Sequence, residues 1–185
     1  MKSSRFVRIV LVALFLSLPG IVSNVAAQKS DSFVFVGNQG NFSVEVPKEF
    51  KDFKYSSEPL DTKAGKREIH VYKSLTKTMG FTVMIIDHGK QQVTDQQAIE
   101  LSEMARAKLS QRGKVLSKSK GKLAGKPALV LFDSMDAGGE KVYSETWFAF
   151  IDGKQFQLSY LTTNTKQITN PAAARFFTSF KYPVK

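Results

Sequence analysis

Cysteine is missing from the 185-residue sequence. Its absence excludes disulfide bridges, zinc sites built from thiolates, cysteine nucleophiles and lipid anchors on cysteine. Histidine is nearly absent as well, because only His70 and His88 are available for imidazole chemistry. Acidic residues are also scarce, with 16 of them against 27 Lys and Arg, which gives a formal net charge of +11. The sequence therefore offers few groups for catalysis and many that attract anions.

The first 27 residues have the pattern of an export signal. The cations Lys2, Arg5 and Arg8 precede an apolar run over residues 9–18, and the small residues 25–27 suit a signal peptidase. The apolar run is shorter than the ~20 residues that cross a bilayer. We predict a signal peptide over 1–27 and a single domain over 28–185 that is periplasmic or secreted; an uncleaved anchor is the alternative.

The sequence as a whole has the composition of an ordinary globular domain. Hydrophobic residues make up 42% and charged residues 23%, and no internal repeat or linker is visible. Alternating or continuous apolar runs predict strands at 33–36, 42–46, 67–75, 80–88, 128–132, 142–151 and 155–163. Residues 48–65 contain Pro59 and little periodicity, so they are predicted to form a loop.

Two helices are predicted. Thr94 and Gln97 form a capping box ahead of apolar residues at three- and four-residue spacing, and Gly113 is the expected C′ residue of that helix. A shorter helix is expected to begin after Asn170, with Pro171 at its first position. Each helix has an apolar face that needs a partner surface.

The predicted fold class is α/β, more closely α+β. Turn signals at Gly138-Gly139 and Asp152-Gly153 join consecutive strands, and hairpins make neighbouring strands antiparallel. The two amphipathic helices then cover the faces of the sheet. We predict an α-β-α sandwich around an antiparallel sheet of six to eight strands.

Several local phrases, read in order, resemble the PsbP-like superfamily. They are residues 42–47 (FSVEVP) followed by aromatic residues, the helix from Thr94, residues 125–128 (GKPA), the Asp152-Gly153 hairpin and residues 174–180 (ARFFTSF). This resemblance spans roughly residues 33–182. The superfamily includes a lumenal subunit of photosystem II, a nuclear Ran-binding factor and small bacterial envelope proteins of undefined role, and the export pattern points to the envelope branch.

The resemblance implies a fold and no activity. Its members share no catalytic motif, and function does not follow from fold. No residue of this sequence can be assigned as a manganese-cluster or Ran contact on this basis. The function of the domain therefore depends on chemical groups of its own sequence.

Catalytic and cofactor motifs are lacking. No Gly-x-Ser-x-Gly elbow occurs, and residues 121–126 resemble a phosphate loop only faintly, because Pro127 stands where a hydroxyl is needed. Asp87 and His88 are adjacent, so in a strand they point to opposite faces and cannot chelate one ion. We predict no metal and no cofactor. A hydrolase or metal-dependent enzyme centred on His88 and nearby carboxylates is kept as an alternative.

The strongest anomaly is a lysine-rich stretch between residues 108 and 126 that contains no acid. The candidate anion-facing stripe is Lys114, Lys118, Lys120, Lys122 and Lys126. Lys118, Lys120 and Lys122 alternate, so in a strand they lie on one face roughly 7 Å apart. They either protect a solvated sheet edge or bind an envelope polyanion, an anionic lipid surface or an acidic protein. Nucleic acid is disfavoured by the export signal.

A set of aromatic residues is the second candidate site. Phe50, Phe53, Tyr55, Trp147 and Tyr160 could wall an apolar pocket between the loop and the sheet. The alternative is that they belong to the core, because 15 phenylalanines in a small protein mostly serve packing.

The sequence therefore favours a non-enzymatic exported binding or interaction domain of the cell envelope. The His88-centred enzyme is the first alternative, and an accessory subunit of a larger membrane complex is the second. The identity of the ligand or partner is left open.

Overall fold

The computed structural model describes residues 31–62, 65–89, 93–109 and 113–184. Its largest element is a sheet of seven strands: β3 (Lys54–Thr62), β4 (Gly65–Leu75), β5 (Met79–Asp87), β6 (Gly113–Leu123), β7 (Lys126–Ala137), β8 (Glu140–Ile151) and β9 (Lys154–Thr162). Their order across the sheet is β3-β4-β5-β9-β8-β7-β6, and every neighbouring pair is antiparallel. The predicted signal peptide lies outside the described residues.

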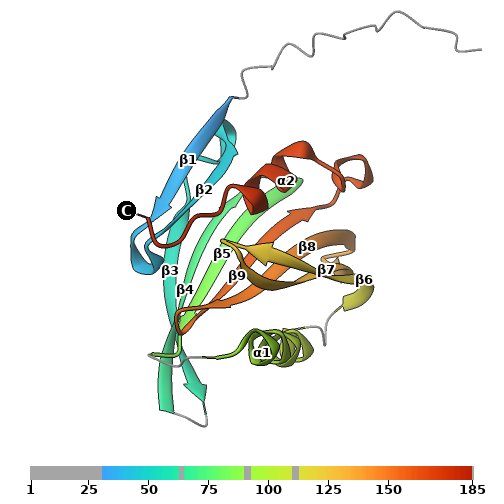
Figure 1. The fold of residues 1–185 in the computed structure, drawn as a ribbon. Coiled ribbons are helices and arrows are strands. Elements are labelled where there is room, and N and C mark those ends of the chain that lie inside the picture. The colour runs from blue at the N-terminus through green and yellow to red at the C-terminus, as the bar shows by residue number, and fades with distance from the viewer. Residues whose placement is uncertain (1–30, 63–64, 90–92, 110–112, 185) are drawn as a thin grey trace, which may run out of the picture.

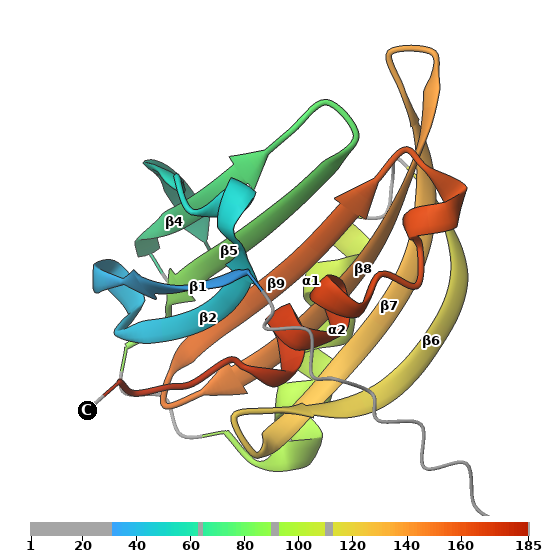
Figure 2. The same ribbon diagram turned by 90° about the horizontal axis from the view of Figure 1, so that it is seen from above.

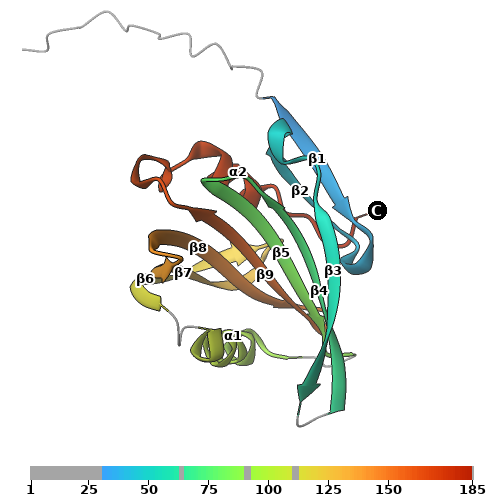
Figure 3. The same ribbon diagram turned by 180° about the vertical axis from the view of Figure 1, so that it is seen from behind.

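Helices cover both faces of this sheet, as Figures 1 and 3 show. Helix α1 (Asp95–Leu109) contacts β7 and β8 on one face. Helix α2 (Pro171–Thr178) lies on the opposite face together with a separate hairpin of β1 (Ser32–Gly37) and β2 (Phe42–Pro47). The predicted α-β-α sandwich with an antiparallel sheet is confirmed. None of the described helices has the length and apolar composition to cross a membrane.

Tight turns join the strands on the β6 side of the sheet. Both central residues of the turns Ala124-Gly125, Gly138-Gly139 and Asp152-Gly153 have positive φ, the geometry of the type I′ hairpin turn. The hairpin signals at the second and third positions are thereby confirmed. The first turn joins β6 to β7, so residues 121–126 form a strand end and a turn rather than a phosphate loop.

Both predicted helix starts are confirmed. The Gln97 backbone N–H donates to Thr94 Oγ1 at 3.2 Å, and the Thr94 N–H donates to Gln97 Oε1 at 2.8 Å, which is the reciprocal capping box. At α2 the Asn170 side chain accepts from the Ala172 N–H at 2.8 Å. These caps satisfy N–H groups that have no partner within the helix.

Two hydrophobic cores follow from this layering. The larger one lies between the sheet and the layer formed by α2 and the hairpin, with fully buried aromatic side chains from all three parts: Phe42, Phe81, Phe156, Phe176 and Tyr160. The smaller one consists of Leu129, Leu131 and Phe148 on the face that carries α1. Alternate residues of β7 thus serve different cores, as the period of a strand requires.

Two local predictions are wrong. Residues 48–65 are not a loop, because Lys54–Thr62 is strand β3 at one edge of the sheet. An edge strand that is exposed along much of its length shows little apolar alternation, and Pro59 is tolerated there. Gly113 is not the C′ residue of α1, because it is the first residue of β6.

Candidate functional site

Residues 113–123 of the lysine-rich stretch form strand β6, the second edge of the seven-stranded sheet (Figure 2). Lys118, Lys120 and Lys122 are all exposed and alternate along it. In the ladder Lys120 lies opposite Leu129, which belongs to the core on the α1 face. The three lysines therefore share the face that carries α1 and form what we call the lysine edge.

Among the described side chains, one ion pair links the lysine edge to α1. Lys118 Nζ lies 2.5 Å from Glu103 Oε1, and both side chains are partly exposed. No ion pair to Lys120 or Lys122 is found among the described residues. The positive charge of this edge is therefore only partly compensated.

The other two members of the predicted stripe lie on the opposite face. A β-bulge between Val115 and Ser117 shifts the register, which places Lys114 opposite Ser134. Lys126 lies opposite Leu123, a residue buried in the larger core. The structure thus brings together three of the five candidate lysines. The bulge could not be inferred from the alternation of lysines alone.

The predicted aromatic set does not form one pocket. Phe50 and Tyr160 are buried in the larger core, and their ring centroids lie 4.8 and 5.3 Å from that of Phe81. Trp147 stacks on Phe177 of α2 at 5.2 Å. These three residues hold the layers together, and only Phe53 and Tyr55 lie at a surface hollow.

That hollow, which we call the aromatic groove, lies between the hairpin and the start of β3. It has a volume of about 270 Å³ and is lined by Phe35, Val36, Asn38, Gln39, Phe53, Tyr55 and Tyr72. Asn38 and Gln39 belong to the short 3-10 helix η1 (Asn38–Gly40) between β1 and β2. The sequence did not predict that Phe35, Tyr72, Asn38 and Gln39 line this groove. They come together because the β1–β2 hairpin packs against the sheet, and this long-range contact leaves no local pattern in the sequence.

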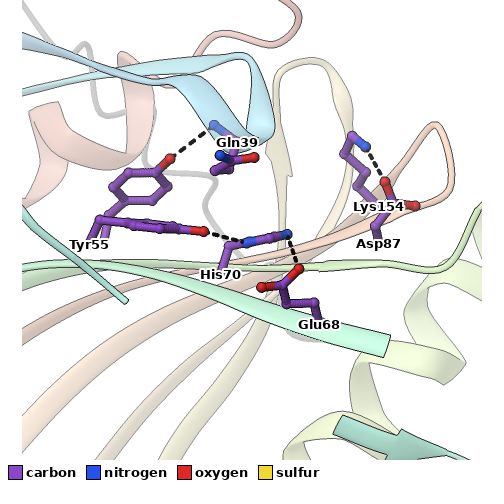
Figure 4. A network of polar contacts seen from close by, with 7 residues as sticks. Gln39, Tyr55, Glu68, His70, Asp87 and Lys154 are labelled. Atoms are coloured by element: carbon purple, nitrogen blue, oxygen red, sulfur yellow. Dashed lines mark hydrogen bonds and ion pairs between the residues drawn. The ribbon is translucent and has the colours of Figure 1, made fainter. Parts of the chain in front are cut away.

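Polar contacts position the tyrosines of the groove (Figure 4). Tyr55 Oη lies 2.9 Å from His70 Nδ1, and His70 Nε2 lies 4.0 Å from Glu68 Oε2. The backbone N–H of Gln39 donates to Tyr72 Oη at 2.9 Å. Burial raises the pKa of the Tyr72 hydroxyl above its ordinary value, so this group stays protonated at neutral pH.

His88 has structural contacts. Its backbone N–H donates to the Gly153 carbonyl at 2.8 Å, and its ring lies 5.1 Å from that of Phe150. The neighbouring Asp87 instead pairs with Lys154 at 2.5 Å, and this hydrogen bond lowers the pKa of the Asp87 carboxyl. Within the described ranges no three His, Asp or Glu side chains are grouped so that they could hold a metal ion.

A half-buried carboxylate lies on the α1 face of the sheet. Asp133 accepts a short hydrogen bond from the Ser144 hydroxyl, but burial is the larger effect and raises the pKa of the Asp133 carboxyl. Both residues line a hollow of about 180 Å³, to which Gln157 also contributes. The Gln157 Oε1 atom is buried and has no hydrogen-bond partner in the described structure.

We expect Asp133→Asn to stabilise the protein near neutral pH. Because the folded-state pKa is raised, ionised Asp133 destabilises the fold above that pKa, and the penalty disappears below the unfolded-state pKa of about 3.9. The gain in unfolding free energy of the variant should therefore fall to zero as the pH is lowered through this window. Urea titrations at several pH values measure it. Exposed Asp136→Asn is the control, and an equal gain there would contradict the assignment to burial.

Comparison with known proteins finds similarity in structure alone. No protein-family model matches the sequence, and no curated protein sequence matches it. The solution structure of cyanobacterial PsbP (CyanoP) from Synechocystis superposes with a TM-score of 0.56 and 11% sequence identity, covering 90% of this chain and 98% of CyanoP. The chain has the PsbP-like fold. Its seven-stranded antiparallel sheet and two helices agree with this match.

Two further solved structures are more distantly similar to this chain. LpqN of Mycobacterium tuberculosis, described as involved in cell envelope biogenesis, has a TM-score of 0.44 and 12% identity, with 87% of this chain and 95% of LpqN covered. PA94 of Pseudomonas aeruginosa, a protein of unknown function, has a TM-score of 0.41 and 11% identity, with 77% and 90% covered. No functional residue is transferred from either structure.

Proposed function

We propose that this PsbP-like protein is a non-enzymatic, exported binding domain that docks on anionic lipid surfaces through its lysine edge. The observation that carries the proposal is the placement of Lys118, Lys120 and Lys122 on one exposed face of an edge strand. A strand spaces alternate side chains by roughly 7 Å, which presents the charges as a regular row. Such a row suits a surface of many phosphates better than a single small anion.

A neighbouring apolar side chain favours lipid over an acidic protein as the partner. Leu116 lies at the β-bulge next to the lysine edge. It is a large apolar side chain of β6, and 43% of its surface is exposed to solvent. Peripheral membrane binding combines such an apolar contact with electrostatic attraction to anionic headgroups.

The proposed attraction is moderate. A cation near an anionic membrane contributes about 1 kcal/mol, and the contact of Lys118 with Glu103 reduces the share of that lysine. Exposed charges are screened beyond about 8 Å at physiological salt. Binding should therefore weaken as salt is added, and it should be reversible.

Export is part of the proposal. It is supported by the cationic and apolar pattern of residues 1–27 and by the small residues at 25–27. The absence of a recognisable nucleophile motif or cofactor motif in the sequence supports a binding role. Cleavage of the leader can be checked by N-terminal sequencing of protein recovered from the native envelope.

The docking proposal is tested by sedimentation with phosphatidylcholine vesicles that contain or lack phosphatidylglycerol. We expect binding to the anionic vesicles alone, and we expect the triple variant Lys118→Gln, Lys120→Gln, Lys122→Gln to bind at least ~10-fold more weakly. The matched control removes the same charge from exposed lysines of β3 and β4: Lys54, Lys66 and Lys73. Equal weakening by the control, or unchanged binding by the lysine-edge variant, would reject the proposed site.

A further inference from the structure

We infer that the aromatic groove binds a neutral pyranose ring of a saccharide. This inference concerns a site on the opposite edge of the sheet from β6 and does not depend on the lysine edge. It rests on three features of the groove: packed aromatic rings among which Tyr55 is exposed and held in place, free amide groups at its rim, and a lining without charge. Each feature matches one part of a sugar ring.

Aromatic rings form the wall of the groove. Phe35 and Phe53 stack with ring centroids 4.3 Å apart, and Tyr55 lies 5.0 Å from Tyr72. Tyr72 is buried, whereas Tyr55 keeps 46% of its surface exposed. The C–H groups on one face of a pyranose pack against exposed aromatic faces of this kind, which removes apolar surface of both partners from water.

The position of Tyr55 is fixed before any ligand arrives. Tyr55 lies directly opposite Tyr72 in the β3–β4 ladder, and its hydroxyl is held by His70 at 2.9 Å. Figure 4 shows Tyr55, His70 and Glu68 in series along the sheet, with Gln39 on the hairpin side. A side chain held in this way loses little conformational entropy on binding, so less of the interaction energy is spent on ordering.

The rim of the groove supplies hydrogen-bonding groups. The side chains of Asn38 and Gln39 are exposed, and their amides have no hydrogen-bond partner in the described part of the chain. Helix η1, which carries both residues, packs closely on the sheet. Gly40 of η1 lies so near Ile85 of β5 that a Cβ on Gly40 would be 2.3 Å from Ile85 Cδ1. Each amide offers two donors and a carbonyl acceptor, which is the pairing that ring hydroxyls need.

The lining excludes other classes of ligand. No charged residue is among the described lining residues, so a charged ligand would find no partner of opposite charge in the lining. A purely apolar ligand would bury the amides without giving them partners, which is costly. A volume of 270 Å³ lies just below the range of about 300–1,000 Å³ for drug-sized ligands, so the groove suits a single ring.

The test is a titration of the isotope-labelled protein with three soluble trisaccharides (maltotriose, cellotriose and chitotriose), followed by nuclear magnetic resonance. We expect at least one of them to shift the side-chain amide signals of Asn38 and Gln39. Tyr55→Ala should weaken that binding at least ~10-fold, which corresponds to ~1.4 kcal/mol. Tyr55→Phe, which keeps the ring and loses the hydroxyl, should retain most of it. Tyr143→Ala, a tyrosine of β8 outside the groove, should have no effect.

Three results would overturn the inference. The first is the absence of amide shifts with all three sugars. The second is binding that survives Tyr55→Ala in a folded variant; if that variant does not fold, Gln39→Ala at the exposed rim takes its place and should also weaken binding. The third is a shift caused by tetramethylammonium and by none of the sugars, which would assign the groove to cations instead.

Discussion

Phe42→Ala is expected to destabilise the protein by about 3–5 kcal/mol. The Phe42 ring is fully buried and lies where three parts of the fold meet. Its centroid is 5.5 Å from Tyr72 of β4, 6.5 Å from Phe156 of β9 and 6.1 Å from Phe180 after α2. Truncation removes the apolar contact of the hairpin with the sheet and leaves a cavity that these rigid rings cannot fill.

Urea unfolding followed by circular dichroism measures the loss. Phe33→Ala in the neighbouring strand is the matched control, because Phe33 is 39% exposed and should cost no more than about 1 kcal/mol. A loss of less than about 1 kcal/mol for Phe42→Ala would mean that the hairpin is not a structural part of the core.

Gly37→Ala is expected to cost about 1–3 kcal/mol, although the backbone there is ordinary. The φ of Gly37 is −96°, a value that any residue adopts. Gly37 faces Phe42 in the β1–β2 ladder, and a Cβ on Gly37 would lie 2.1 Å from Phe42 Cε1. Glycine is needed because an aromatic ring lies over this position, an arrangement by which cross-strand aromatic residues cover strand glycines.

A double-mutant cycle separates this steric cause from a general effect on the turn. In the Phe42→Ala background the ring is gone, so the added methyl group of Gly37→Ala should cost close to nothing. The two substitutions should therefore couple by about as much as Gly37→Ala costs alone. Additive losses, measured by the same urea titrations, would contradict the steric explanation.

Local signals in the chain were sufficient for most elements of the fold. The capping box at Thr94 and the cap at Asn170 depend on residues within three positions of each other, so they can be read directly. The same holds for the I′ turn at Asp152-Gly153, where both residues adopt positive φ. Strand β3 was missed because its pattern is that of an exposed edge, which carries little hydrophobic periodicity.

The candidate sites were predicted less well, because they depend on long-range contacts. Trp147 and Tyr55 are both aromatic residues of strands, yet Trp147 stacks beneath α2 and Tyr55 opens onto the aromatic groove. The two residues differ because α2 covers Trp147 on β8, whereas the β1–β2 hairpin leaves Tyr55 on β3 partly exposed. Lys114 was assigned to the same stripe as Lys118, and a single bulge put it on the other face.

Composition and periodicity by themselves determined that this is a basic, cysteine-free sandwich of helices on an antiparallel sheet, since charge counts, caps and turns act over a few residues. Packing between distant segments set the pairing of β5 with β9 and the separate layer of the N-terminal hairpin, and it selected which lysines and aromatic rings meet. These outcomes depend on contacts between segments tens of residues apart, which are chosen by the joint packing of all layers and leave no local pattern in the sequence.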